Sequence, residues 1–307
     1  MSSDVGARNR PPRSPAIPYD PQAEDANQPY FDANLARWDE SVAIHAASRG
    51  YDLEGYLKGE KTLYAVEMDE VGDVSGKTLL HLQCHFGMDT LNWARLGATV
   101  TGLDFSPEAI ARARRLAEEI GIEDACFIES NIYDAPSVLQ EQFDVVYTGI
   151  GALNWLPDIR NWARVASGYV KPGGFLYLYE GHPMLWSLDE DRAELPFQVK
   201  YPYFEGDPIE WDWDQTYTDG PKLKNTRGYE WNHGLGEIVT ALLDAGLRLD
   251  FLHEHRTIAW QALPMMEPVD GPVAEGSHHQ RRVGWQLPEP LRNLVPLMYS
   301  LRASRPA

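Results

Sequence analysis

The sequence has only two cysteines among its 307 residues, Cys84 and Cys126. Both fall in or beside segments expected to form core strands, so we expect reduced thiols and no disulfide framework. No apolar run approaches the roughly 20 residues that a membrane-spanning helix needs. The N-terminus carries charges and prolines where a signal peptide has its apolar region. These absences predict a cytoplasmic protein with no membrane partner.

Basic residues are also scarce, with 27 Lys and Arg against 46 Asp and Glu and a formal net charge of −19. Binding to nucleic acid or to an anionic membrane requires a basic surface that neutralises phosphate groups. The charge therefore argues against nucleic-acid partners. A small neutral or cationic molecule fits better, and the sequence leaves open whether the chain forms a homodimer.

The N-terminal quarter of the chain divides into a tail and a helical segment. Residues 1–27 are rich in Pro and Arg and lack apolar periodicity, which predicts a disordered tail. Between Tyr30 and His45, bulky residues recur every three or four positions, as in an amphipathic helix. Tyr51 to Glu70 indicates a second helical stretch. We therefore expect residues 28–76 to form a helical cap.

The most informative stretch runs from Lys77 to Asp104 and predicts a βαβ unit. Thr78 to Leu82 is a short apolar run typical of a buried parallel strand, and a tight turn follows it. Helical spacing then continues to Gly97, and a second apolar strand ends on Asp104. In such units the first turn approaches a nucleotide-like ligand, while the closing acid accepts hydrogen bonds from ribose hydroxyls.

This stretch resembles the nucleoside-binding half of the class I methyltransferases that use S-adenosylmethionine (SAM). It departs from their acidic, glycine-rich turn, because His81 replaces the usual acid and Gln83 and His85 replace two glycines. Only Gly87 remains. We expect side chains at these positions to impose ordinary backbone angles and to suit a ligand without a pyrophosphate. A nicotinamide-dependent Rossmann dehydrogenase is therefore disfavoured.

Further matches to this family follow in order along residues 77–182, the expected SAM-binding half. A capped helix begins at Ser106, and a strand leads into Asn131 and Ile132, where the family recognises adenine. A strand opening with Phe143 ends at Thr148, and the run from Lys171 to Glu180 is like the family's turn and fifth strand.

The remaining elements complete the expected fold. Leu235 to Ala245 predicts a helix, Leu247 to Leu252 a sixth strand and Leu297 to Ala303 a last, antiparallel strand. We therefore expect an α/β fold, a Rossmann-like seven-stranded and mostly parallel sheet with one antiparallel strand. Residues 234–307 are its C-terminal part.

Residues 183–233 are an insertion of about fifty residues, longer than a simple connection needs. Aromatic residues alternate with acids along it, and the pattern from Trp211 to Asp214 predicts a strand with one aromatic and one acidic face. We expect an antiparallel lid that holds a planar or cationic substrate by stacking or cation–π contact. The same aromatics could instead form the insertion's own core or a dimer contact.

The resemblance implies a set of site residues. The residues expected to bind the cofactor are Tyr30, Trp38, Gln83, Cys84, His85, Gly87, Asp104, Phe105, Asn131, Ile132 and Thr148. The residues expected to bind the substrate are Trp155, His182, Trp211, Trp213 and Trp231. No carboxylate ends the fourth strand, where related enzymes place a magnesium ligand, so we expect no metal.

Methyl transfer from a sulfonium depends mainly on alignment and on the exclusion of water. If the nucleophile must lose a proton, histidine is the usual base near neutral pH. We select His233, which follows the aromatic insertion, with His182 in reserve. His233 could equally cap the next helix or satisfy backbone groups.

The predicted function is methylation of a small molecule. Within the family, the Leu82 to Gly87 turn and the aromatic insertion look like bacterial enzymes that methylate indoles of tryptophan-derived natural products. We therefore expect an aromatic, indole-like or amine-bearing acceptor. The alternatives are a catalytically inactive SAM-binding scaffold and a nicotinamide-dependent oxidoreductase.

Overall fold

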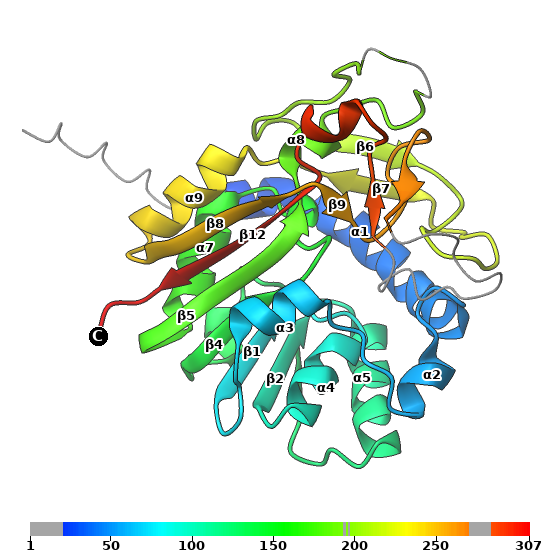
Figure 1. Ribbon diagram of the computed structural model, residues 1–307. Coiled ribbons are helices and arrows are strands. Elements are labelled where there is room, and N and C mark those ends of the chain that lie inside the picture. Colours follow the sequence, from blue (N-terminus) through cyan, green and yellow to red (C-terminus); the bar gives the residue numbers. More distant parts are fainter. Residues whose placement is uncertain (1–20, 193–194, 196, 270–283) are drawn as a thin grey trace, which may run out of the picture.

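A computed structural model describes residues 21–192, 195, 197–269 and 284–307. Its centre is a seven-stranded sheet (Figure 1). The strands, in spatial order, are β3 (Cys126–Glu129), β2 (Thr99–Asp104), β1 (Thr78–Leu82), β4 (Phe143–Thr148), β5 (Val170–Gly181), β12 (Met298–Ser304) and β8 (Arg248–His255). β12 runs antiparallel between β5 and β8, and the other pairs from β3 to β5 are parallel. The predicted fold class is confirmed. Cys126, however, is exposed at the start of β3.

Neighbouring residues of the central strands face opposite sides of the sheet, because side chains alternate along a strand. Leu79 and Val145 pack on one side, with α3 (Ala65–Val71) and α4 (Met88–Arg95). Leu80 and Val146 pack on the other side, with α7 (Ile159–Gly168) and α9 (Leu235–Asp244). Strands buried on both faces explain the unbroken apolar runs in the sequence.

Helix α5 (Pro107–Glu119) shows how the sequence sets an element's start. The hydroxyl of Ser106 accepts a hydrogen bond from the backbone N–H of Ala109, and Pro107 fits the first turn because its missing N–H would have no helical partner there. Its apolar face packs against β3 and the turn after β1. The short helix α6 (Ala135–Val138) follows β3.

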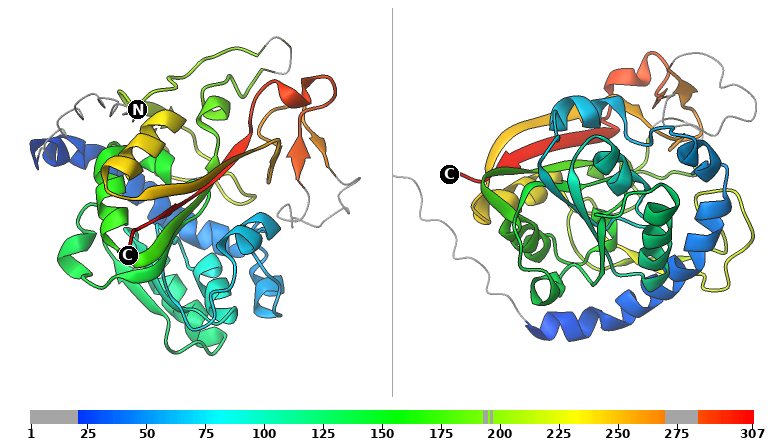
Figure 2. Two further views of the ribbon diagram at one scale, coloured as in Figure 1. Left: turned by 60° about the vertical axis from the view of Figure 1, so that its left-hand side comes forward. Right: turned by 90° about the horizontal axis from the view of Figure 1, so that it is seen from below.

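The N-terminal helix α1 (Pro21–Ala47) begins earlier than expected. The prediction of disorder through residue 27 is wrong for residues 21–27, and residues 1–20 lie outside the described residues. The segment contains Ala, Glu and Gln, which favour helix without needing an apolar face, so hydrophobic periodicity could not reveal it. Helix α1 wraps along the outside of the sheet domain, and α2 (Leu53–Leu57) follows it (Figure 2).

Two additions interrupt the sheet topology. The 3-10 turn η1 (Leu153–Trp155) follows β4. The first addition follows β5 and contains helix α8 (Pro183–Trp186) and the antiparallel pair β6 (Ile209–Asp212) and β7 (Arg227–Glu230). The second lies between β8 and β12 and holds β9 (Thr257–Ile258), β10 (Glu267–Pro268), β11 (Trp285–Gln286) and η3 (Leu291–Asn293). The sequence analysis missed the second addition, because two-residue strands carry no periodic signal. Both lie beyond the carboxyl end of the sheet.

Of the helices that the structure describes, none has the length and apolar character to cross a bilayer.

Candidate active site

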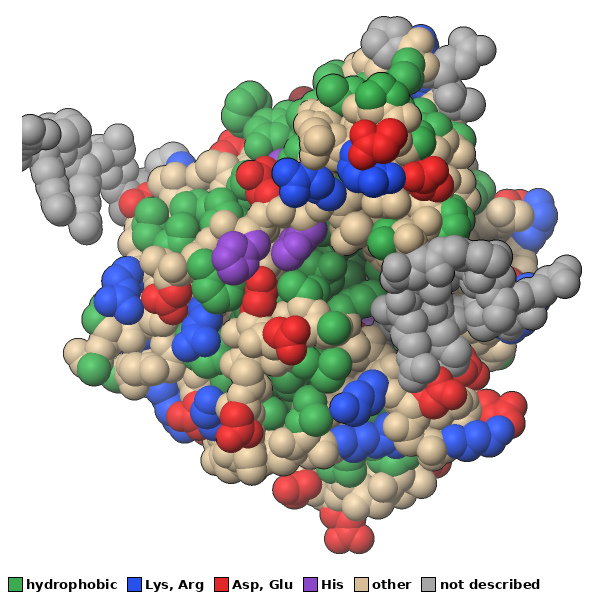
Figure 3. Space-filling view, in the orientation of Figure 1, with side chains coloured by type: hydrophobic (Ala, Val, Ile, Leu, Met, Phe, Trp, Pro, Cys, Tyr) green, Lys and Arg blue, Asp and Glu red, His purple; other side chains and the backbone are tan. Residues whose placement is uncertain are grey.

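A cavity of about 650 Å³ lies above the carboxyl ends of β1, β2 and β4. Its walls come from α1, the turn after β1, the turns after β2, β3 and β4, and both additions. Figure 3 shows a hollow lined by hydrophobic side chains at the centre of one face. In an open α/β sheet this edge is where ligands bind. We call the part around Asp104 the cofactor half and the part beneath the additions the acceptor half.

The turn after β1 has a glycine-like backbone despite its side chains. Gln83 and His85 have φ of 58° and 49°, and Gly87 has φ of 82°. The expectation of ordinary backbone angles at Gln83 and His85 is therefore wrong. Left-handed backbone costs a residue with a side chain roughly 1–2 kcal/mol. Gln83 offsets part of this cost by donating a hydrogen bond from Nε2 to the carbonyl of Ala152 at 2.7 Å. Strain of this kind is typical of ligand-binding turns.

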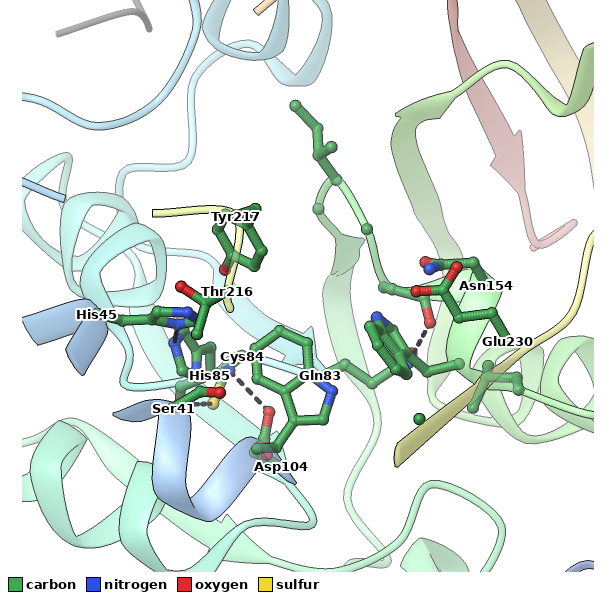
Figure 4. A pocket seen from close by; sticks show the side chains of 18 of the residues that line it. Ser41, His45, Gln83, Cys84, His85, Asp104, Asn154, Thr216, Tyr217 and Glu230 are labelled. Atoms are coloured by element: carbon green, nitrogen blue, oxygen red, sulfur yellow. Dashed lines mark hydrogen bonds between the residues drawn. The ribbon is translucent and has the colours of Figure 1, made fainter. Parts of the chain in front are cut away.

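Asp104 ends β2 and is buried at the floor of the cofactor half (Figure 4). Its carboxylate accepts hydrogen bonds from the backbone N–H groups of His85 at 2.7 Å and Ser106 at 3.0 Å. Burial nevertheless raises the pKa of Asp104 to about 6. A buried carboxylate with only backbone donors is well suited to accept further hydrogen bonds from ligand hydroxyls.

Asn131 and Ile132 follow β3 and line the same half, as does Phe105. The Asn131 side-chain oxygen accepts a hydrogen bond from the backbone N–H of Tyr133 at 3.0 Å. This contact orients the amide, so its NH₂ group is the part available as a donor.

Three aromatic rings meet where α1 crosses the turn after β1. Trp38 lies edge-on to His85 and to Trp155, each with ring centroids 5.2 Å apart. His45 Nδ1 lies 3.0 Å from His85 Nε2. Burial, together with the charge of Arg37, lowers the pKa of His45 to about 3, so its ring is neutral near pH 7. Trp38 thus lines the cavity.

The loop of residues 213–226 joins β6 to β7, and we call it the strap. Arg37 on α1 binds it through the backbone carbonyls of Trp213, Gln215, Asn225 and Thr226, at 2.7, 2.7, 3.4 and 3.0 Å. Tyr217, on the strap, packs against His45 with ring centroids 4.7 Å apart. Helix α1 therefore fastens the strap over the cofactor half.

Replacing Arg37 by methionine should loosen the strap, because it removes the donors to all these carbonyls while keeping an apolar stem. We expect backbone amides of residues 213–226 to exchange with deuterium at least about tenfold faster, while those of β1 and β4 are unchanged. Arg49→Met is the control, because the Arg49 side chain forms an exposed ion pair with Asp219 of the same strap, and such pairs contribute little. Equal exchange in both variants would contradict the role of Arg37.

The acceptor half is walled by aromatic side chains from distant parts of the chain. Its aromatic residues include Trp155, Trp186, Tyr201, Trp211, Trp231 and Trp260. Among the acids that line the cavity, Glu190 and Glu230 belong to this half. Burial raises the pKa of Glu230 to about 7. This half can stack a planar molecule and contact a polar hydrogen or a cationic group.

The predicted strand around Trp211 exists as β6, where Trp211 is half-buried while Glu210 and Asp212 are exposed. Trp213 departs from the predicted alternation. It lies beyond the end of the strand and is 51% exposed, at the rim of the cavity.

Most of the residues predicted for the site line the cavity. They are Trp38, Gln83, Cys84, His85, Gly87, Asp104, Phe105, Asn131, Ile132, Trp155, Trp211, Trp213 and Trp231. Tyr30, Thr148, His182 and His233 are not among its lining residues. Tyr30 packs instead on Tyr229 and Trp231, with ring centroids 4.7 and 5.8 Å apart. Thr148 is fully buried within β4.

His233 is buried outside the cavity, so its selection as the general base is wrong. Its Nε2 lies 2.8 Å from the carbonyl oxygen of Leu156 and 3.1 Å from that of Leu153. Its Nδ1 lies 2.9 Å from Glu205 Oε2. Burial alone would raise the pKa of Glu205. Contacts with His233 and with the N–H of Ile159 outweigh burial and hold this pKa below its usual value. His233 fastens the first addition to the turn after β4.

His182 has a structural position too. Its Nδ1 accepts a hydrogen bond from the backbone N–H of Met184 at the start of α8, and its Nε2 lies 3.0 Å from Glu254. Its selection as a substrate-binding residue or reserve base is therefore also wrong.

Sequence reasoning missed several cavity residues, among them Arg37, His45, Glu190, Glu230 and Trp260. No pattern marked Glu230, because Arg227, Gly228, Tyr229 and Glu230 do not alternate between apolar and polar residues. The other missed residues lie in helices or loops, where the sequence pattern does not indicate which side chains face a cavity.

The described residues contain no cluster of three or more His, Cys, Asp or Glu side chains that could hold a metal ion.

Comparison with known proteins places this geometry in context. A methyltransferase-domain family matches residues 80–176. The ubiquinone biosynthesis O-methyltransferase of Aeromonas salmonicida is 32% identical over 151 residues, which cover 48% of this chain and 63% of that protein. The one from Klebsiella pneumoniae is 33% identical over 135 residues, or 43% of this chain and 55% of that protein. The chain thus spans only a little over half the length of these relatives.

A solved structure shares the fold. The S-adenosylmethionine dependent methyltransferase from Mesorhizobium loti superimposes with a TM-score of 0.54 at 17% sequence identity, covering 81% of this chain and all of that one. Residues 80–176 therefore form a methyltransferase domain, and the chain has the class I methyltransferase fold.

Proposed function

We propose that this member of the class I methyltransferases transfers a methyl group from SAM to a small molecule bound in the acceptor half. One observation carries the proposal: a single cavity joins a buried acid at the end of β2 to an aromatic chamber. The first feature suits a nucleoside, and the second suits a planar acceptor.

The residues of the cofactor half fit SAM. Asp104 accepts hydrogen bonds from ribose hydroxyls, and the amide of Asn131 with the apolar side chain of Ile132 holds adenine. The left-handed turn from Gln83 to Gly87 carries the methionine part. The side chains on this turn leave less room for a pyrophosphate than glycines would, which disfavours the oxidoreductase alternative.

When bound, SAM supplies an electrophilic methyl group. The chain's own contribution is to align the acceptor with that group and to exclude water. Trp38 lies edge-on to Trp155 of the acceptor half, and the two rings offer a face and an edge to a sulfonium. The strap closes the cofactor half from solvent.

The acceptor that we propose is an aromatic, indole-like or amine-bearing metabolite. Its support is the set of tryptophan and tyrosine side chains in the acceptor half together with Glu190 and Glu230. The relatives are named as O-methyltransferases, so phenols belong among the compounds to be tested. Formation of S-adenosylhomocysteine with a panel of indoles, phenols and amines tests this proposal, and the inactive scaffold would form none.

Asp104→Ala should weaken SAM binding about 10- to 100-fold, or about 1–3 kcal/mol, because buried ribose hydroxyls lose their acceptor. Titration calorimetry with SAM measures the effect, and the same titration with NAD should show no binding. Asp124→Ala, at an exposed position before β3, is the control and should bind SAM normally. Unchanged SAM affinity in Asp104→Ala would remove this residue from the site.

A further inference from the structure

We infer that Glu230 is the catalytic residue that accepts the proton released by the acceptor when its nucleophilic atom is methylated. The inference rests on the proposed function and adds a base, which that function leaves open.

The position of Glu230 follows from the pairing of β6 with β7. Glu230 is opposite Ile209, and both line the cavity. Glu230 lies beside Asn154, across the cavity from His45 and His85 (Figure 4). It is thus in the acceptor half, whereas Asp104 and His85 belong to the cofactor half. A group that takes a proton from the acceptor must lie on this side.

The surroundings of Glu230 leave its carboxylate able to accept a proton. The side chains of Asn154 and Trp211 contact it, and the charges of Arg37 and Glu190 act on it in opposite directions. Among the described residues, no Lys, Arg or His nitrogen lies within 4.0 Å of the Glu230 carboxylate, so this carboxylate forms no ion pair with them. Arg37 instead donates to the strap's carbonyls. Burial raises the pKa of Glu230 to about 7, near the pH at which a general base works best.

The other histidines and carboxylates that line the cavity have hydrogen-bond partners among the described residues. Glu67 accepts from the hydroxyl of Tyr147, Asp89 from that of Thr62, and Asp104 from the backbone N–H of His85. His45 pairs with His85, and His81 Nδ1 lies 2.8 Å from the hydroxyl of Thr90. Burial lowers the pKa of His81 to about 4, which makes it a weak base. Glu190 accepts a hydrogen bond from the hydroxyl of Tyr201 at 2.9 Å.

A lone pair of the acceptor's oxygen or nitrogen forms the bond to the methyl carbon, and the carbon–sulfur bond breaks with its electron pair going to sulfur. The sulfonium becomes a neutral thioether, and the acceptor loses its proton to the Glu230 carboxylate. Because the Glu230 carboxyl ionises near neutral pH, it then returns the proton to solvent.

The test compares Glu230→Gln with wild type, measuring S-adenosylhomocysteine formed from SAM with tryptamine, indole and catechol between pH 5 and 9. Wild-type kcat should rise with pH through about 7, because only the ionised carboxylate accepts a proton. Glu230→Gln should lower kcat by roughly 10²- to 10⁴-fold and abolish this rise, with SAM affinity within about threefold of wild type. An unchanged kcat or pH profile would overturn the inference.

Glu210→Gln is the matched control, since Glu210 is an exposed glutamate on the adjacent strand β6, and its kinetics should equal wild type. Folding is checked by thermal melting at pH 8. Between pH 4.5 and about 7 the native protein holds a proton at Glu230 that the unfolded chain releases, so ionisation of this carboxyl destabilises the fold as pH rises. Glu230→Gln should therefore melt no lower than wild type. A lower melting temperature together with an unchanged pH profile would assign a structural role.

A second measurement needs no turnover. Tryptamine, indole and catechol are titrated into the S-adenosylhomocysteine complex at pH 7 in two buffers of different ionisation enthalpy. A hydrogen-bond donor of the bound compound favours the ionised form of the Glu230 carboxyl group. Wild type and Glu210→Gln should therefore release protons when the compound binds, while Glu230→Gln should release fewer. Equal release in all three would overturn the placement of Glu230. Failure of the proposed function is a different result, namely no SAM binding by any variant, the control included.

Discussion

Replacing Gly87 by valine should lower the free energy of unfolding by about 2–5 kcal/mol, since two costs add at this position. The first is its φ of 82°, which a β-branched residue adopts only with strain. The second is contact, because a Cβ here would lie 2.8 Å from the ring of Phe127 and 2.9 Å from the Cβ of Ala113. Urea unfolding monitored by circular dichroism measures the loss.

A second glycine separates these costs. Gly121, at the end of α5, has φ of 72° and no heavy atom within 4 Å of a Cβ built on it. Gly121→Val should therefore pay only the backbone cost of about 1–2 kcal/mol. Equal losses of stability in the two variants would mean that the packing of residue 87 against α5 and β3 does not require glycine there. Calorimetry on the folded fraction of Gly87→Val should also show weaker SAM binding, because the turn must move.

Replacing His233 by alanine should cost about 3 kcal/mol of stability and leave kcat of the folded enzyme nearly unchanged. The substitution leaves the carbonyls of Leu153 and Leu156 without their imidazole donor, and it leaves the Glu205 carboxylate with the N–H of Ile159 but no imidazole. Urea unfolding and turnover per folded molecule measure the two effects separately.

The partner of His233 supplies the control. Because Glu205 lies 2.9 Å from the imidazole, adding Glu205→Gln to His233→Ala should cost less than the sum of the two single changes, since the unpaired carboxylate is gone. A loss of kcat by 10²-fold or more with unchanged stability would restore His233 as a base. That outcome would contradict its position outside the cavity.

The sheet and most of the cofactor half could be predicted because they depend on local patterns. An apolar run between turn residues predicts a buried strand, and Asp104 is recognised by its place at the end of one. The backbone of the turn after β1 was predicted wrongly, because the side chains of Gln83 and His85 argue for ordinary angles. Only the surrounding tertiary contacts hold these two residues in the left-handed region.

The acceptor half was harder to predict, since it is assembled from segments that lie far apart in the sequence. Trp211 and Trp260 are 49 positions apart and meet at one cavity. Histidine was preferred as the base because its ordinary pKa is near 7, yet both selected histidines are bound to structural partners. Burial brings the pKa of Glu230 into the same range, and burial cannot be read from a single sequence.

The placement of the acceptor half in insertions has a consequence for the diversification of this fold. Its walls come largely from the two additions, which follow β5 and β8 without altering the strands themselves. Doubling a loop's length raises its closure cost by only about 0.6 kcal/mol, so such segments can lengthen, shorten or change composition at little expense to the sheet. New acceptor specificities can therefore arise by changes in the two additions. The residues that face the nucleoside are less free to change, because they belong to the packed core of the sheet.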